Sequence, residues 1–180
     1  MLELAQQSDT RHVVLTGGEP LVSPLLTTLA ADLRQQGFHV TIETAGTVLP
    51  CGWEEHPVLC DLLSLSPKLR GSGPDPTRNP SWADRHERRR MPIGTMRKLI
   101  DRSAASQVKF VVDQSGEFGE IDDVVGRLGL PPSQVWIMPQ GTTVRTLDEA
   151  ESWLRPLTES RGYRYCDRMQ IRWFGNRRGT

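Results

Sequence analysis

The sequence predicts an α/β fold, with mostly parallel strands in a sheet that is open or partly closed into a barrel. Short apolar segments typical of buried strands, such as residues 13–15 and 107–113, alternate with segments whose apolar residues have helical spacing. Polar residues marked by Gly or Pro follow four of the expected strands. Strands separated by helices form parallel sheets, and such sheets bind ligands at the carboxyl ends of their strands.

The size and composition of the chain are those of one ordinary globular domain over residues 1–180. Of its 180 residues, 37% are apolar and 24% are charged, and Lys plus Arg equals Asp plus Glu at 22 each. The balanced charge gives no general attraction for nucleic acid or an anionic membrane. No apolar run approaches the roughly 20 residues of a membrane span, and "MLELAQQSDTRH" lacks the pattern of a secretory signal. We therefore expect a cytoplasmic protein without a nucleic-acid or membrane partner.

The three cysteines are few and lie far apart in the sequence. Cys51, Cys60 and Cys166 match no local metal-binding spacing, and an odd, sparse set is typical of ordinary thiols in a reducing compartment. The four histidines are equally dispersed. No metal ligand is predicted in this chain.

The helix after the first strand has clear start and stop signals. Ser23 and Pro24 read as its N-cap and first residue, and Gly37 as its end. Residues 38–44 then alternate at period two, so one face can pack under helices while the other ends in a carboxylate. The remaining strands are expected within residues 57–68, 107–113, 134–141 and 167–175, and helices at 2–8, 82–91, after Pro92 and at 118–128.

One further helix is expected near the C-terminus. Thr146 and Glu149 have the spacing of a capping box at its start. Pro156 should kink or shorten it, because proline lacks the amide hydrogen that the helix interior needs. Residues 70–80, rich in Gly and Pro, are expected to form a loop.

Four strand exits carry residues that could bind a ligand: "TGGEP", "ETAGT", "SLSPK" and "MPQG". Gly17 and Gly18 leave the backbone open, and Glu19 can accept hydrogen bonds from an ammonium group. Lys68 on a proline-fixed turn could hold a carboxylate or a ribose, and Gln140 carries both a donor and an acceptor. Each residue also fits an ordinary turn, but four such exits together favour a ligand site.

The same exits resemble a known family. "VVLTGGEPLV" resembles the glycine-rich motif with which radical S-adenosylmethionine enzymes bind the methionine amino group. With "IETAGT", "LLSLSPKL" and the terminal "FGNRRGT", essentially the whole chain resembles the 7-carboxy-7-deazaguanine synthases of queuosine biosynthesis. The family's activity is a carbon–nitrogen lyase reaction, in which 6-carboxy-5,6,7,8-tetrahydropterin becomes 7-carboxy-7-deazaguanine by radical ring contraction with loss of ammonia.

The resemblance implies a partial parallel β/α barrel of the radical S-adenosylmethionine type, a homodimer, a 4Fe-4S cluster and Mg²⁺. It implies that Thr16 and the C-terminal carboxylate of Thr180 contact the pterin substrate. No side chain is an evident general acid or base, so no catalytic residue is predicted. The residues implied to contact S-adenosylmethionine are Gly17, Gly18, Glu19, Glu43, Ser66, Pro67, Lys68, Met138, Pro139, Gln140 and Gly141.

The chain departs from the family at the cluster motif. Family members carry three closely spaced cysteines before the glycine-rich motif, and a 4Fe-4S cluster needs thiolate ligands, but no cysteine here precedes Cys51. We expect that the N-terminal strand and cluster-binding loop, about one βα unit of ~30 residues or more, are missing and that the chain alone is inactive. Two other functions remain open: a non-catalytic remnant that binds S-adenosylmethionine or a partner, and a glycyl-radical activase.

Overall fold

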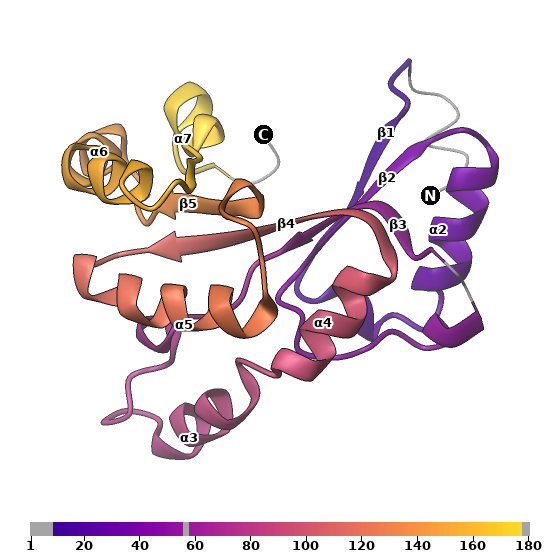
Figure 1. The fold of residues 1–180 in the computed structure, drawn as a ribbon, viewed down its shortest axis with the longest axis horizontal. Helices are drawn as coiled ribbons and strands as arrows, with labels where there is room; N and C mark the ends of the chain where they lie inside the picture. The colour runs from indigo at the N-terminus through magenta and orange to yellow at the C-terminus, as the bar shows by residue number, and fades with distance from the viewer. Residues whose placement is uncertain (1–8, 56–57, 178–180) are drawn as a thin grey trace. The chain divides into compact units, whose positions relative to one another are not determined.

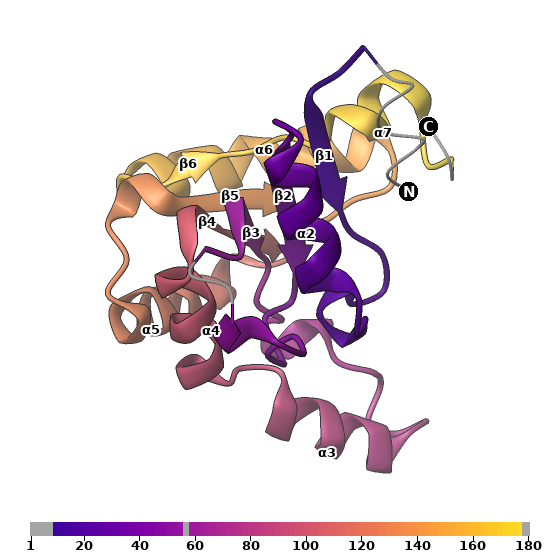
Figure 2. The same ribbon diagram turned by 90° about the vertical axis from the view of Figure 1, so that its right-hand side faces the viewer.

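The computed structural model describes residues 9–55 and 58–177 (Figures 1 and 2). Six strands form one open sheet in the order β1-β2-β3-β4-β5-β6, and every strand pair with a defined register is parallel. The predicted α/β class with a sheet that does not close on itself is therefore confirmed. The chain divides into two compact units, residues 1–67 with 88–107 and residues 68–87 with 108–180.

The first unit is built on three parallel strands whose apolar residues face helices. Its strands are β1 (His12–Leu15), β2 (His39–Thr44) and β3 (Cys60–Leu65), and its α-helices are α2 (Leu26–Gln35) and α4 (Ile93–Asp101). Helix α2 packs against β2, and α4 packs against β3 (Figure 2). Val40, Ile42 and Thr44 are buried, whereas the residues between them are half-buried, so the predicted alternation along β2 is confirmed.

The start of α2 differs from the prediction. The chain first forms a 3-10 turn, η1 (Pro20–Val22), because the Glu19 carboxylate accepts a hydrogen bond from the Leu21 amide. Ser23 and Pro24 then connect this turn to the helix, which begins at Leu26. The prediction that Ser23 caps α2 was wrong, because Ser23 instead ends η1, with its amide donating to the Pro20 carbonyl, and Leu25 takes the N-cap position.

The second unit contains the C-terminal half of β4 and the elements that follow it. Strand β4 (Ser103–Val112) is followed by η4 (Ser115–Glu117) and α5 (Phe118–Leu128), which ends at Gly129 in the left-handed conformation, as predicted. The elements after α5 are η5 (Pro132–Gln134), β5 (Val135–Pro139), α6 (Val144–Glu159), β6 (Arg164–Tyr165) and α7 (Met169–Phe174). Helix α6 packs against β5 and β6 (Figure 2).

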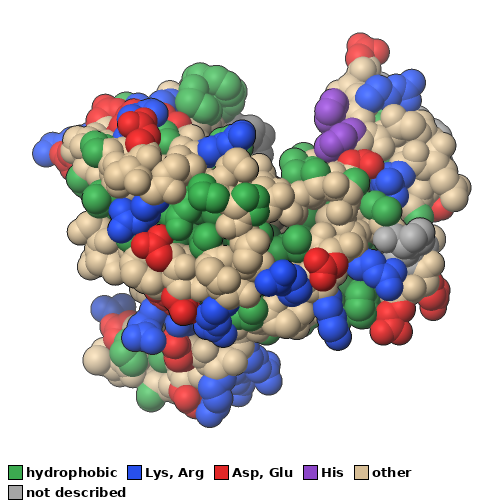
Figure 3. Space-filling model, viewed as in Figure 1, with side chains coloured by type: hydrophobic (Ala, Val, Ile, Leu, Met, Phe, Trp, Pro, Cys, Tyr) green, Lys and Arg blue, Asp and Glu red, His purple; other side chains and the backbone are tan. Residues whose placement is uncertain are grey.

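Three short helices lie in connecting segments, the first between β2 and β3 and the other two between β3 and α4. They are η2 (Trp53–Glu55), η3 (Arg70–Ser72) and α3 (Pro80–Arg89). Helix α3 has no buried residue among those described, which agrees with its highly charged sequence. Acidic and basic side chains are interspersed on the face drawn in Figure 3, as the balanced composition leads one to expect.

Two predictions near the C-terminus were wrong. Helix α6 is capped by Thr143, whose side chain accepts from the Thr146 amide, because the helix begins earlier than expected; it continues through Pro156 to Glu159. Residues 169–174 form a helix where a strand was predicted, and only Ile171 of this helix is buried. The helix predicted at residues 2–8 lies outside the described residues. Within the described ranges, no helix is long and apolar enough to cross a membrane.

Candidate functional site

The exit of β1 presents open backbone, as the glycine pair predicted. Gly17 and Gly18 are exposed, and a β-carbon built on either would meet no other atom within 4 Å. Gly17 also has φ = 142°, a conformation that residues with side chains rarely adopt. The peptide groups beside both glycines are therefore accessible to a ligand.

Glu19 joins the exits of β1 and β2. One carboxylate oxygen accepts from the Leu21 amide at 3.1 Å and from the Thr44 hydroxyl at 2.6 Å, and the other accepts from the Ala45 amide at 3.1 Å. An ionised carboxylate offers about four acceptor positions. Glu19 thus stabilises two loops at once and keeps about one acceptor position for a ligand.

The exit of β2 is closely packed against the core of the first unit. Gly46 has φ = 71°, and a β-carbon there would overlap the Leu65 Cδ1 atom and lie 3.2 Å from Met96 Cγ. The Thr44 hydroxyl, which donates to Glu19, accepts from the Gly46 amide at 2.9 Å. Only glycine fits this position without displacing the core.

Two further hydrogen bonds connect the predicted residues of the first unit. Thr16 donates from its hydroxyl to Glu43 Oε2 at 3.5 Å, and the Ser66 amide donates to the Thr44 carbonyl at 2.8 Å. Pro67, which follows Ser66, is buried. The structure therefore links the exits of β1, β2 and β3 within one unit, as the sequence predicted for the carboxyl ends of parallel strands.

The exit of β5 in the second unit is anchored on both sides. The Gln140 amide donates to the Val112 carbonyl at 2.8 Å, which extends the pairing of β5 with β4. A β-carbon on Gly141 would lie 2.8 Å from Thr146 Oγ1 and 2.9 Å from Leu147 Cδ2, so this position has no room for a side chain. Lys68, also a predicted ligand contact of this unit, is exposed.

Arg168 is a residue of this exit that the sequence did not indicate. Its Nη1 donates to Gln140 Oε1 at 3.3 Å and to the Gly141 carbonyl at 3.0 Å. Arg168 lies in no motif, and the expected strand at residues 167–175 gave no reason to place it beside the β5 exit. Its position depends on the turn from β6 into α7, which no local sequence signal revealed.

Arg172 fixes α7 against α6. It forms ion pairs with Asp167, with Asp148 at 2.7 Å and with Glu151 at 3.2 Å. Hydrogen bonds to Asp148 and Asp167 raise the pKa of the Arg172 guanidinium above its usual value. These contacts hold the segment that carries Arg168.

The described residues do not fit a 4Fe-4S cluster. Cys51 is exposed, Cys60 is buried and Cys166 is half-buried, and no three His, Cys, Asp or Glu side chains in the described ranges form a metal-binding group. Burial raises the pKa of the Cys60 thiol, which disfavours the thiolate that iron requires. The prediction for Thr180 lies outside the described residues.

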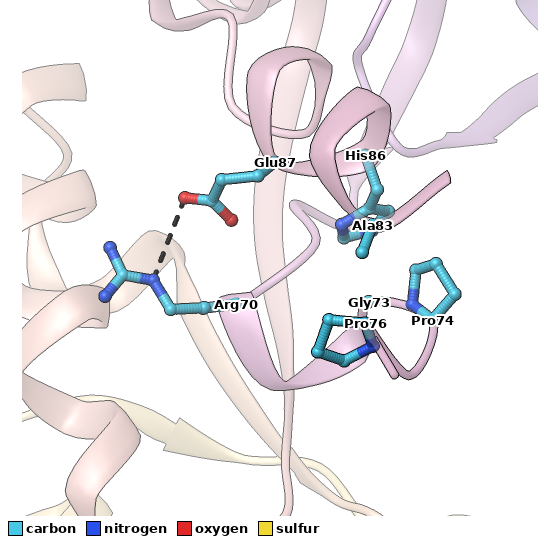
Figure 4. Close-up of a pocket in the computed structure, with 7 residues that line it drawn as sticks. All are labelled: Arg70, Gly73, Pro74, Pro76, Ala83, His86 and Glu87. Carbon is cyan, nitrogen blue, oxygen red and sulfur yellow. Dashed lines mark ion pairs between the residues drawn. The ribbon is translucent and has the colours of Figure 1, made fainter. Parts of the chain in front are cut away.

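A separate surface hollow of about 380 Å³ lies in the second unit (Figure 4). Arg70 and Glu87 point toward one another at its edge, with their nearest charged atoms 3.7 Å apart. Pro74, Pro76 and His86 line the remainder with Gly73 and Ala83. None of the predicted site residues lines this hollow.

Comparison with known proteins relates the chain to one group of synthases. No family model matches it. It is 56% identical over 180 residues to the 7-carboxy-7-deazaguanine synthase of Rhodopirellula baltica, an alignment that covers 100% of this chain and 68% of the relative. The synthase of the same name from Halobacterium salinarum is 35% identical over 179 residues, covering 94% of this chain and 67% of that relative.

A solved structure shares the fold. A domain of the pyruvate-formate lyase-activating enzyme from Bacteroides vulgatus matches with a TM-score of 0.55 and 16% identity, over 86% of this chain and 97% of that domain. At this identity the match describes the fold alone. It agrees with the open sheet of parallel strands described above.

Proposed function

The chain belongs to the 7-carboxy-7-deazaguanine synthase family, and we propose that it forms the part of such an enzyme that binds S-adenosylmethionine and the pterin substrate. The reaction is the ring contraction of 6-carboxy-5,6,7,8-tetrahydropterin to 7-carboxy-7-deazaguanine with release of ammonia, a carbon–nitrogen lyase reaction. The observation that carries the proposal is 56% identity to a synthase over all 180 residues. The proposed assembly is a homodimer that acts on a small molecule.

Residues proposed to contact S-adenosylmethionine occur in each unit. In the first unit, the open backbone at Gly17 and Gly18 and the remaining acceptor position of Glu19 suit the amino group of the methionine moiety. Glu43, Ser66 and Pro67 in the first unit, and Lys68 and Met138, Pro139, Gln140 and Gly141 in the second, complete the proposed set. When bound, S-adenosylmethionine supplies the radical that begins the ring contraction.

The substrate contacts are proposed at Thr16 and at the C-terminal carboxylate of Thr180. The Thr16 hydroxyl follows directly after β1 and is exposed, and its bond to Glu43 is long at 3.5 Å. A ligand can therefore replace this weak hydrogen bond at a small cost in free energy. No described residue is assigned to the family's 4Fe-4S cluster or to Mg²⁺.

The experiment that tests the proposal measures binding and turnover separately. Isothermal titration calorimetry with S-adenosylmethionine and with 6-carboxytetrahydropterin should show one site for each. Anaerobic reconstitution with iron, sulfide and dithionite should yield no 5′-deoxyadenosine, because the described thiols do not form a cluster site. If the chain fails to bind S-adenosylmethionine, or fails to bind 6-carboxytetrahydropterin, the proposal is refuted. Formation of 5′-deoxyadenosine would refute the expected lack of turnover.

A non-catalytic binding function is the second candidate, and the separation of Cys51, Cys60 and Cys166 favours it. Such a protein would bind S-adenosylmethionine or a partner but would not bind the pterin. The calorimetric titration with 6-carboxytetrahydropterin therefore separates the two functions. A glycyl-radical activase has less support, because its fold neighbour shares only 16% identity and the synthases share up to 56%.

A further inference from the structure

The side chain of Gln140 is held in one orientation by an arginine. The Arg168 guanidinium has only N–H donors, so the atom of Gln140 that it approaches at 3.3 Å is the carbonyl oxygen Oε1. The same Nη1 atom also donates to the Gly141 carbonyl at 3.0 Å. Arg168 therefore binds two carbonyl oxygens of this exit, and the side-chain amide of Gln140 points its NH₂ away from Arg168.

Arg168 itself is fixed at its backbone. The Asp167 carboxylate accepts from the Arg168 amide at 2.7 Å, and its other oxygen pairs with Arg172. The Nε atom of Arg168 is buried and has no hydrogen-bond partner in the part of the chain that the structure describes. A buried donor without a partner costs free energy, so this placement is not explained by stability alone.

The neighbouring backbone cannot rearrange easily. The backbone amide of Gln140 donates to the Val112 carbonyl of β4. The space beside Gly141 is filled by the side chains of Thr146 and Leu147. Gln140 is nevertheless exposed, so its NH₂ faces solvent rather than the core. The loop thus presents a donor in a defined direction.

We propose that Arg168 is a positioning residue that orients Gln140, so that the β5 exit binds a hydrogen-bond acceptor of the ligand through the Gln140 NH₂ group. The acceptor is an oxygen or ring nitrogen of an adenosyl ligand, and this identification rests on the proposed function. The Gln140 Oε1 atom and the Gly141 carbonyl already accept from Arg168, so the NH₂ group is the part of the Gln140 side chain that is directed at the ligand. Arg168 acts through Gln140 and does not itself contact the reacting atoms.

The orientation is tested first in the protein without ligand. ¹⁵N relaxation of the Gln140 side-chain amide by NMR should show a restricted group in the wild type and a mobile group in Arg168→Met. The control is Arg145→Met, which removes an exposed arginine of the same unit whose ion-pair partner among the described residues is Glu149 on its own helix. An equally ordered Gln140 amide in Arg168→Met would overturn the positioning role, whatever the ligand.

Binding of S-adenosylhomocysteine, measured by calorimetry, tests the donor. Gln140→Glu keeps the size of the side chain and gains an ion pair with Arg168, so its melting temperature should be unchanged or higher. Its affinity should nevertheless fall by about tenfold or more, because a carboxylate replaces the donor. Arg168→Met should weaken binding about 5- to 20-fold, Arg168→Lys should restore part of the loss, and Arg145→Met should change nothing.

The outcomes separate this inference from the proposed function. If the wild type binds no S-adenosyl compound, the ligand proposed for this exit is wrong, and the NMR measurement still decides whether Arg168 orients Gln140. If the wild type binds and Gln140→Glu binds equally well or more tightly, the assignment of a donor at this exit is wrong. Loss of affinity with retained melting temperature supports it.

Discussion

Replacing Glu19 by Ala tests whether this residue stabilises the first unit before any ligand is present. The substitution removes the acceptor of three donors: the Leu21 amide, the Thr44 hydroxyl and the Ala45 amide. Thr44 is only 4% exposed, so water cannot easily replace the carboxylate at its hydroxyl. The Leu21 amide lies in η1 and Leu21 is 2% exposed, whereas Ala45 is half-buried, so the two amides regain only part of their hydration.

The expected loss follows from these contacts. A buried donor left without a partner costs about 1–3 kcal/mol, and the Leu21 and Ala45 amides add less because the short segments that carry them can shift toward solvent. We expect Glu19→Ala to lower the free energy of unfolding by about 2–4 kcal/mol in total. For a chain of this length that corresponds to a fall in Tm of roughly 4–16 °C.

The assay is urea denaturation, with hydrogen exchange measured for the peptide that spans residues 39–46. The matched control is Glu54→Ala, which removes the same charge from an exposed position in the same unit. Exchange in that peptide should accelerate in Glu19→Ala and not in the control. A free energy of unfolding within about 0.5 kcal/mol of the control, the usual range for surface substitutions, would refute the structural role of Glu19.

Three more predictions concern stability and pH. Gly46→Ala should destabilise the chain by about 2–4 kcal/mol and Gly37→Ala by about 1 kcal/mol in urea denaturation, because both have positive φ but only the first would also overlap a core leucine; equal losses would contradict the packing argument. Burial raises the pKa of Tyr163 and Tyr165 to about 12, so near-ultraviolet absorbance should show little phenolate at pH ~10 in the folded protein and half-ionised tyrosine after unfolding. The stability that these two tyrosines contribute is complete below pH ~10 and is lost as the pH rises through about 12. Burial alone would raise the pKa of Asp61, but hydrogen bonds from a backbone amide and an arginine outweigh it and lower the pKa, so the stability lost in Asp61→Asn should be constant above pH ~4 and should disappear as the pH falls through the lowered value.

Local sequence patterns predicted the elements whose cause is local. The alternation in β2 and the Gly129 stop of α5 are fixed by residues next to each other in the sequence, and both were confirmed. Helix α7 was mistaken for a strand because Met169, Ile171 and Trp173 alternate with polar residues. What makes this segment helical is distant in sequence, since its arginine pairs with acidic residues of α6.

The same distinction applies to the site. The glycines, Glu19 and Gln140 were identified because they stand directly after predicted strands. The partners that fix them were not: Thr44 reaches Glu19 across 25 residues and Arg168 reaches Gln140 across 28 residues. Side-chain hydrogen bonds over such separations leave no periodic trace in the sequence, so the fold has to be known before they can be named.

The exits of β1 and β5 are each held by one charged side chain, which accepts hydrogen bonds at the first exit and donates them at the second. This difference decides which ligand groups each exit can bind. At the β1 exit the anchor is the acceptor Glu19, which collects three donors and keeps about one acceptor position. At the β5 exit the anchor is the donor Arg168, which collects two acceptors and leaves the Gln140 NH₂ as the exposed group. The first exit therefore suits a cationic or donor group, and the second suits an acceptor. Each property belongs to one unit taken by itself. Glu19→Lys should therefore weaken binding of an ammonium group at the first exit, and Gln140→Glu should weaken binding of an acceptor group at the second.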